Sequence, residues 1–191
     1  NVLKNLKEEN DNTTYKEPIN VEESQYEELD IERLLSQGQK IVAFLGTSKN
    51  GTSFLVNNVA ELLSSNGIDT AILDLTQNRN AYYIYTRNED DLREKSNYLM
   101  RNLVEGRADG LKEHRNLTIY TSAFENDTEL TNVEPIIETL ARNHTVVLLD
   151  CDFTTPMKYF KYAQEIYLVQ SMDILTIQPL TAFLRKLSDK G

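Results

Sequence analysis

Blocks of apolar and polar positions alternate along most of this chain, and their spacing predicts strands and helices in turn. Five short apolar runs have the length of buried strands: 40–45, 70–73, 117–120, 145–149 and 166–169. Between them, apolar residues recur at helical spacing in four stretches: 52–66, 90–105, 133–142 and 173–187. Strands that alternate with helices predict an α/β fold, a three-layer sandwich whose mostly parallel sheet carries helices on both faces.

The apolar sides of the predicted helices indicate which residues face the sheet. In the helix at 52–66 this side consists of five residues: Phe54, Leu55, Val59, Leu62 and Leu63. Gly67 follows as a helix stop. In the helix at 90–105 the inward residues are expected to be Leu92, Leu99 and Leu103, and a helix at 173–187 is predicted despite Pro179.

Residues 1–38 differ in character and are predicted to form an acidic linker that leads into a domain at 39–191. Acidic residues cluster at 22–23 and 27–30, and Pro18 interrupts the segment. Low hydrophobicity with clustered like charge is typical of a linker, here with a short helix at 26–36. An acidic arm that docks on a basic partner is the alternative interpretation.

Ligands of open α/β sheets bind beyond the carboxyl ends of the strands, so the segments at those positions are the candidate functional segments. They are residues 46–53, 74–80, 121–122 and 150–156. The first of them is the clearest motif, because it is a glycine loop between a predicted strand and a predicted helix.

Gly46 and Gly51 of this loop have the spacing of a P-loop, in which backbone N–H groups and a helix N-terminus cradle phosphate. The position that should carry lysine is Thr52, whereas the hydroxyl position after it is kept as Ser53. The loop has therefore kept its shape and lost its main charge. The candidate anion-binding residues are the whole loop: Gly46, Thr47, Ser48, Lys49, Asn50, Gly51, Thr52 and Ser53.

Composition restricts the classes of function. A net charge of −10 and a pI near 4.7 make nucleic acid an unlikely partner, because broad phosphate-backbone binding needs basic surface. Cys151 is the sole cysteine, so no disulfide framework is expected and a reducing compartment fits best. The sequence predicts no transmembrane segment and no signal peptide. Since the first residue is Asn1, the sequence is expected to be a piece of something longer.

Four segments occur in an order known from one family: the loop 46–53, the strand end 72–76, the strand 146–150 and the segment 163–169. In this order they resemble the ParA/MinD superfamily of deviant P-loop ATPases, which position cellular machinery. The resemblance covers residues 40–187 and is greatest to the CpaE/TadZ-like proteins of tight-adherence pilus systems. Because the family's domain usually continues past the position of Gly191, its last strands and adenine-side loops are expected to be missing here.

The resemblance implies that three side chains of an active ATPase are lost. The family's signature lysine follows the first glycine and reaches across a dimer to the partner's nucleotide, and Thr47 stands at that position. The lysine that grips the β- and γ-phosphates is replaced by Thr52. The aspartate that orients the attacking water aligns with Thr76.

Three other residues of the pattern remain: Ser53 for a magnesium-bound hydroxyl, Asp74 at a strand end and Asp150 at the switch-II position. A charge-assisted hydrogen bond to phosphate is worth about 1.5–3 kcal/mol, so losing both lysines costs roughly two to four decades in affinity. We therefore expect no catalytic residue and no resident cofactor, with at most weak binding of Mg-ATP or phosphate. Magnesium is expected at Ser53 and Asp150 only if a nucleotide brings it. Lys49 either points into solvent or folds back toward a phosphate.

Three functions remain open, in the following order. The first is a non-hydrolysing scaffold for pilus or secretion assembly, with protein partners and a homodimer that needs no nucleotide. The second is an ATP-switched ATPase in which Lys49 replaces the missing lysines. The third is a module that cradles some other phosphate compound. The protein is expected to be bacterial and cytoplasmic, with recruitment by its partners to the inner face of the membrane or the cell pole.

Several other features allow both a functional and a structural interpretation. The tyrosine-rich run at 82–85 suits an exposed interface patch and internal packing equally well. His114 and His144 lack metal-ligand spacing and are expected at the surface. Cys151 lies between aspartates that would raise its thiol pKa, and the neighbouring Asp152 is expected to form a turn. A small mixed surface, for a partner contact or a lid, is expected from Lys158, Tyr159, Phe160, Lys161 and Tyr162.

Overall fold

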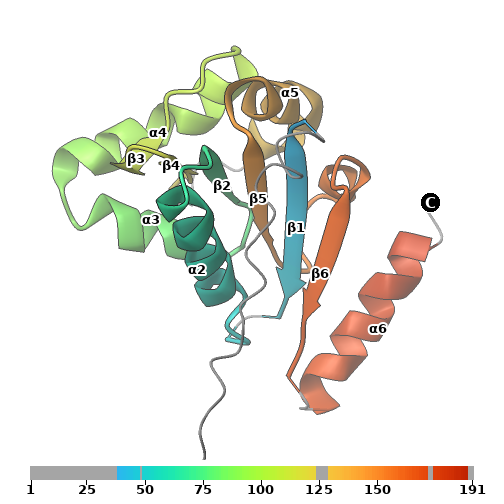
Figure 1. Cartoon of the computed structure of the whole chain (residues 1–191). Helices are drawn as coiled ribbons and strands as arrows, with labels where there is room; N and C mark the ends of the chain where they lie inside the picture. The colour runs from blue at the N-terminus through green and yellow to red at the C-terminus, as the bar shows by residue number, and fades with distance from the viewer. Residues whose placement is uncertain (1–37, 48, 124–128, 172–173, 189–191) are drawn as a thin grey trace, which may run out of the picture. The chain divides into compact units, whose positions relative to one another are not determined.

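A computed structural model describes residues 38–47, 49–123, 129–171 and 174–188 (Figure 1). Its strands are β1 (Lys40–Gly46), β2 (Thr70–Asp74), β3 (Leu111–His114), β4 (Leu117–Tyr120), β5 (Val146–Cys151) and β6 (Glu165–Val169). Its helices are α2 (Thr52–Ser65), α3 (Asn80–Thr86), α4 (Asp90–Val104), α5 (Val133–Asn143) and α6 (Ile174–Ser188), with a short 3₁₀ helix η2 (Met157–Lys161). The helix predicted at 26–36 lies outside the described residues.

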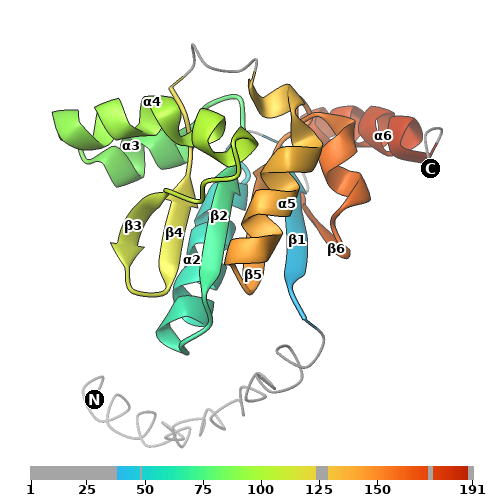
Figure 2. The same cartoon turned by 90° about the horizontal axis from the view of Figure 1, so that it is seen from above.

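The strands in this part of the chain form one sheet in the order β3-β4-β2-β5-β1-β6. All neighbouring strands are parallel except β3 and β4, which pair antiparallel at one edge. Strands β1, β2 and β5 are buried almost throughout, because α2 packs on one face of the sheet and α5 on the other (Figure 2). The predicted mostly parallel sheet with helices on both faces is therefore confirmed.

The parallel register brings the strand ends to one edge of the sheet. Asp74, the last residue of β2, pairs with Asp150 of β5, and Asp150 pairs on its other side with Phe44 of β1. Gly46 ends β1 two residues further on, so the glycine loop begins beside these carboxylates. The candidate segments after β1, β2 and β5 thus meet at this edge, as the sequence predicts.

The predicted apolar face of α2 is wrong. Leu63 is buried, but Phe54, Leu55 and Leu62 are exposed. The buried side consists instead of mostly small residues, four of them spaced by one helical turn: Thr52, Val56, Ala60, Leu63 and Ser64. Small side chains allow the helix to lie close to a sheet whose own side chains are large, whereas the periodicity argument counts hydrophobicity and ignores size.

The small mixed surface expected around η2 is also wrong in part. Tyr159 and Phe160 are buried, and only Lys158, Lys161 and Tyr162 remain exposed. The Tyr159 hydroxyl donates a hydrogen bond to the carbonyl oxygen of Leu130 at 2.9 Å. The two aromatic rings contribute far more apolar area than the lysine stems, so the turn is held with the rings inward.

His144 is buried and not at the surface as expected, being only 6% exposed. Its Nδ1 lies 3.0 Å from Oδ2 of Asp69, and its Nε2 lies 2.9 Å from the hydroxyl of Tyr120. The residue joins the start of β5 to β2 and β4, because Asp69 precedes β2 and Tyr120 ends β4. His114 remains partly exposed and pairs with Glu61 of α2.

The pKa of His144 is expected to lie below 6.5 in a histidine titration followed by NMR. Burial disfavours the imidazolium, and the positive charge of Lys112 adds to this, against the opposing effect of Asp69. Because the unfolded chain then binds the proton more readily, the free energy of unfolding should fall as the pH drops below 6.5. The variants His144→Gln and His114→Gln assign the two resonances. A pKa above 6.5 for His144 would show that the pair with Asp69 outweighs burial.

Candidate functional site

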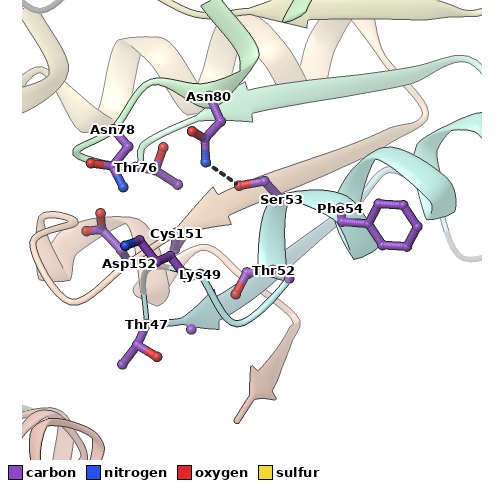
Figure 3. Close-up of a pocket in the computed structure, with 12 residues that line it drawn as sticks. Thr47, Lys49, Thr52, Ser53, Phe54, Thr76, Asn78, Asn80, Cys151 and Asp152 are labelled. Carbon is purple, nitrogen blue, oxygen red and sulfur yellow. Dashed lines mark hydrogen bonds between the residues drawn. The ribbon is translucent and has the colours of Figure 1, made fainter. Parts of the chain in front are cut away.

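A cavity of about 300 Å³ opens at the carboxyl edge of the sheet, between the loop after β1 and the segment after β2 (Figure 3). The residues that line it come from the glycine loop, from 76–80 and from the end of β5: Gly46, Thr47, Lys49, Gly51, Thr52, Ser53, Phe54, Thr76, Asn78, Asn80, Cys151 and Asp152. The structure therefore brings together the segments that the sequence analysis selected. Ser48 lies outside the described residues.

Two residues of the described part of the loop have a left-handed backbone. Lys49 and Gly51 adopt left-handed conformations, with φ of 69° and 82°. The backbone N–H of Asn50 donates to the carbonyl oxygen of Thr47 at 3.2 Å, and the amide side chain of Asn50 bonds the Thr47 hydroxyl. Helix α2 then begins at Thr52 without a side-chain cap, and its first three residues line the cavity, so the partial positive charge of its N-terminus lies at the cavity wall.

Thr52, the first residue of α2, is packed against the end of β1. A Cβ atom added to Gly46 would lie 2.1 Å from the Thr52 hydroxyl oxygen and 2.8 Å from the carbonyl oxygen of Val169. The Thr52 hydroxyl is buried and has no hydrogen-bond partner within the described residues. Glycine at 46 is thus required by close packing, and the side chain opposite it supplies a short hydroxyl without charge.

Asp74 is fully buried and accepts four hydrogen bonds from the described residues. Its Oδ1 accepts from the backbone N–H and the hydroxyl of Thr76, at 3.1 and 2.6 Å. Its Oδ2 accepts from the N–H of Ala81 at 3.1 Å and from the hydroxyl of Thr121 at 3.2 Å. Burial raises the pKa of Asp74, although the bonds from Thr76 and the charge of Arg79 oppose this. The carboxylate therefore ties the end of β2 to α3 and to the end of β4.

The hydrogen bonds of Asp74 also decide what Thr76 can do. Its hydroxyl donates to Asp74, and its carbonyl oxygen accepts from the guanidinium of Arg79 at 2.7 Å. The Thr76 hydroxyl therefore already donates its one hydrogen bond to Asp74. Threonine offers no carboxylate to accept a proton from water.

Asp150 is a buried carboxyl group with one unpartnered oxygen, Oδ1, among the described residues. Burial raises the pKa of Asp150 to about 7, and the negative charge of Asp74 adds to this, while a hydrogen bond with Ser53 lowers it. The Ser53 hydroxyl in turn accepts from the side-chain amide of Asn80 at 3.3 Å.

The donor set near Asp150 fits magnesium only in part. An unpartnered carboxylate oxygen beside Ser53 is a suitable ligand pair for a hard cation. However, the described residues contain no group of three or more His, Cys, Asp or Glu side chains that could hold a metal ion. Ser53 and Asp150 could therefore hold magnesium only together with water and the oxygens of a phosphate ligand.

Arg79 has a structural role that the sequence analysis missed. It is buried, adopts a left-handed conformation with φ of 48°, and donates to the carbonyl oxygens of Thr76 and Asp74. The buried guanidinium of Arg79 thus fixes the segment after β2 beside Asp74. The only signal in the sequence was an arginine within the candidate segment 74–80.

Asp152 forms the expected turn, and the pKa of Cys151 is raised in the expected direction. The Cys151 thiol lines the cavity but is fully buried, and burial first, then the charge of Asp150, raises its pKa well above the ordinary value. Asp152 forms a turn by accepting a hydrogen bond from the N–H of Thr154 at 2.7 Å. Its other oxygen accepts from the N–H of Gln77 at 2.6 Å, so it also positions the cavity wall.

The tyrosine-rich run lies in α3 and is partly packed and partly exposed, and whether its exposed part is an interface stays a prediction. Tyr83 and Ile84 are exposed, whereas the Tyr85 hydroxyl bonds the side chain of Asn57 on α2. Burial raises the pKa of Tyr85 to about 12. Half of the run therefore packs and half faces outward.

Comparison with known proteins identifies solved structures that have the same fold. No protein-family model matches the sequence, and no curated protein matches it. Solved structures do match, among them a putative plasmid partition protein from Borrelia burgdorferi B31 bound to AMPPNP. That match has a TM-score of 0.60 and 15% identity, and it covers 79% of this chain and 72% of that chain.

Two further structures agree with this match. Cobyrinic acid a,c-diamide synthase from Mycobacterium smegmatis, with a bound ATP analogue and magnesium, gives a TM-score of 0.62 at 16% identity, covering 79% of this chain and 68% of that chain. The pNOB8 ParA protein gives 0.59 at 14% identity, covering 76% and 56%. Identities this low establish the fold alone. This domain therefore has the fold of the ParA-like P-loop ATPases.

Proposed function

We propose that this domain is a non-hydrolysing ParA/MinD-like module that acts as a scaffold for the positioning or assembly of other proteins. The observation that carries the proposal is the chemistry of the cavity wall. In the described part of the chain, Lys49 is the sole basic residue that lines the cavity. The position of the main phosphate-binding lysine holds Thr52, whose hydroxyl is packed against Gly46.

The catalytic side chains are lacking as well. The Thr76 hydroxyl donates a hydrogen bond to Asp74, and a threonine side chain cannot act as a base toward water. A cation that stabilises phosphoryl transfer is worth roughly 10³–10⁵ in rate, so its loss together with the water-orienting carboxylate leaves no useful hydrolysis. The backbone cradle of the loop still suits a weakly bound anion.

The partners are proposed from the sequence resemblance to CpaE/TadZ-like proteins, which favours a tight-adherence pilus or secretion assembly in the bacterial cytoplasm.

Another structural neighbour is pNOB8 ParA bound to nonspecific DNA, with a TM-score of 0.56. A net charge of −10 argues against the same ligand here. None of the helices in the described residues has the length and apolar character that a bilayer crossing requires.

We expect no steady-state release of phosphate from ATP by the purified protein, with or without magnesium. The expectation follows from the threonines at positions 47, 52 and 76. Lys49→Ala should leave this baseline unchanged. Magnesium-dependent turnover that Lys49→Ala abolishes would overturn the proposal.

An ATP-switched domain that uses Lys49 is the second candidate, because that lysine lines the cavity from within the loop. Calorimetry with Mg-ATP distinguishes the two. Binding at low-micromolar affinity or tighter that is lost in Lys49→Ala would favour the switch. Lys161→Ala is the matched control, since Lys161 is exposed on η2 and does not line the cavity.

A further inference from the structure

Helix α2 begins at the cavity wall without the capping group that a helix start usually has. Its N-cap position is Gly51, which has a left-handed backbone with φ of 82° and no side chain to accept a hydrogen bond. The first hydrogen bond of the helix runs from the N–H of Leu55 to the carbonyl oxygen of Gly51 at 2.9 Å. The N–H groups of Thr52, Ser53 and Phe54 therefore precede the helical ladder, and all three residues line the cavity.

The side chain of Thr52 is independent evidence for a ligand at this helix start. Thr52 is only 6% exposed and lines the cavity, and its hydroxyl oxygen has no hydrogen-bond partner within the described residues. In Figure 3 this oxygen points toward the side of the cavity on which Thr47 and Lys49 lie. Since a buried hydroxyl is rarely left without a partner, a group that occupies the cavity is the one that can supply it.

The charges around the cavity favour a ligand with a single negative charge. In the described part of the chain, Lys49 is the sole basic residue of the cavity wall, and the helix N-terminus adds about half an elementary charge. The carboxylate of Asp152 lines the same wall, and the buried Asp150 shares a hydrogen bond with Ser53. A phosphate monoester carries about 1.5–2 negative charges at neutral pH and a triphosphate carries more, so these carboxylates oppose both. A carboxylate ligand carries only one.

We propose that the cavity binds one carboxylate group, which takes the place of the missing N-cap of α2. Aspartate is among the preferred capping residues, because its carboxylate accepts from the free N–H groups of the first turn and offsets the partial positive charge there. A ligand carboxylate at this helix start can accept from the Thr52 hydroxyl and from the N–H groups beside it. It belongs either to a small organic acid or to an acidic side chain of a partner protein. The inference rests on the proposed function, because it names the ligand of a site that does not hydrolyse ATP.

The cavity has room for a small group and an apolar rim for the rest of the ligand. Its volume of about 300 Å³ is at the lower end of the range for ligand pockets. Phe54 lines it, and the Phe54 ring is 75% exposed and points away from Thr47 and Lys49 in Figure 3. A ligand that extends beyond its carboxylate can therefore contact this ring.

NMR titrations of the full chain at constant ionic strength test the proposal, with acetate, acetamide, inorganic phosphate and Mg-ATP as probes. We expect acetate to give a saturable shift of the amide resonances of Thr52, Ser53 and Phe54. Acetamide, which has no charge, should not shift them, and phosphate should bind more weakly than acetate. A blocked aspartate, N-acetyl-aspartate α-amide, distinguishes the two sources of the carboxylate. Binding tighter than that of acetate indicates a protein side chain, and weaker binding indicates a small acid.

Two variants test the groups that hold the carboxylate. Thr52→Val keeps the branched shape and removes the hydroxyl, and it should weaken acetate binding by about threefold to tenfold. Lys49→Ala removes the positive charge of the wall and should weaken binding at least as much. The matched controls are Thr181→Val and Lys161→Ala, which change exposed residues of α6 and η2 that do not line the cavity. Both should leave acetate binding unchanged.

The outcomes separate this inference from the proposed function. If neither acetate nor the blocked aspartate gives a saturable shift of these amides, the inference is overturned while the proposed function stands. Phosphate or Mg-ATP that binds more tightly than acetate overturns it as well, and only hydrolysis of that ATP would overturn the proposed function too. Acetate binding that Thr52→Val leaves unchanged would place the carboxylate away from the helix start and also contradict the inference.

Discussion

Replacing Asp150 with asparagine is expected to stabilise the domain at pH 8, by about 2–4 kcal/mol in the free energy of unfolding. Asp150 is buried, one of its oxygens has no hydrogen-bond partner within the described residues, and it pairs in register with the equally buried Asp74. Burial and the neighbouring charge raise its pKa from 3.8 to about 7. An asparagine keeps the shape and removes the charge, and its amide can donate toward Asp74.

The direction of the pH effect follows from proton uptake. Between pH 3.8 and about 7 the folded protein keeps a proton on Asp150 that the unfolded chain has already released. The folded state binds more protons there, so stability falls as the pH rises through this window. One pKa unit corresponds to about 1.36 kcal/mol, so above pH 7 the whole pKa shift of Asp150 lowers the free energy of unfolding by about 4 kcal/mol.

Urea denaturation at pH 5 and pH 8 measures this effect. The wild-type protein should lose stability between the two values, and Asp150→Asn should lose less, with the contribution of Asp74 remaining. Asp91→Asn, on the exposed side of α4, is the control and should change stability by less than about 0.5 kcal/mol. If Asp150→Asn destabilises the domain at pH 8, the carboxylate has a partner that balances its charge. Magnesium that stabilises the wild type but not this variant would identify that partner as a cation.

The alternation of strands and helices could be predicted because each buried strand is a short run of aliphatic residues between polar turns. The meeting of residues 46–53, 74–80 and 150–156 at one edge also followed, since parallel strands place their carboxyl ends together. The short 3₁₀ helix η2 was not predicted, and β3 and α3 were missed for local reasons. β3 (Leu111–His114) is short and has only one apolar residue, and α3 (Asn80–Thr86) is too short for a helical period to be recognised.

The outward face of α2 could not be predicted, because it depends on side-chain size at the contact with the sheet. Val56 and Ala60 pack inward while larger apolar residues of the same helix are exposed. The hydrogen bond that Asp74 accepts from Thr121 could not be predicted either, since Thr121 is 47 positions further along the chain. Arg79 was missed because arginine is seldom buried without a carboxylate or carbonyl partner, and only the folded backbone supplies its carbonyls.

Asp74→Ala should have the opposite effect to Asp150→Asn, at a site one strand away. Removing the Asp74 side chain leaves the N–H groups of Thr76 and Ala81 and the hydroxyl of Thr121 buried without their acceptor. Each unsatisfied buried donor costs about 1–3 kcal/mol, so a loss of roughly 3–5 kcal/mol or more is expected out of a typical 5–15. Thermal and urea unfolding at pH 7 should therefore show clearly lower transition midpoints than those of the wild-type protein.

Two further variants separate the hydrogen bonds of Asp74 from general effects of a lost carboxylate. Asp74→Asn keeps one oxygen acceptor, but its amide cannot accept from the N–H of Ala81, so an intermediate loss is expected. Asp152→Ala removes the bond to Gln77 at the more exposed side of the same cavity wall and should cost only about 0.5–1.5 kcal/mol. If Asp74→Ala cost no more than Asp152→Ala, the segment between β2 and α3 would not be held by Asp74. The cavity wall would then depend on Arg79 and on strand pairing alone.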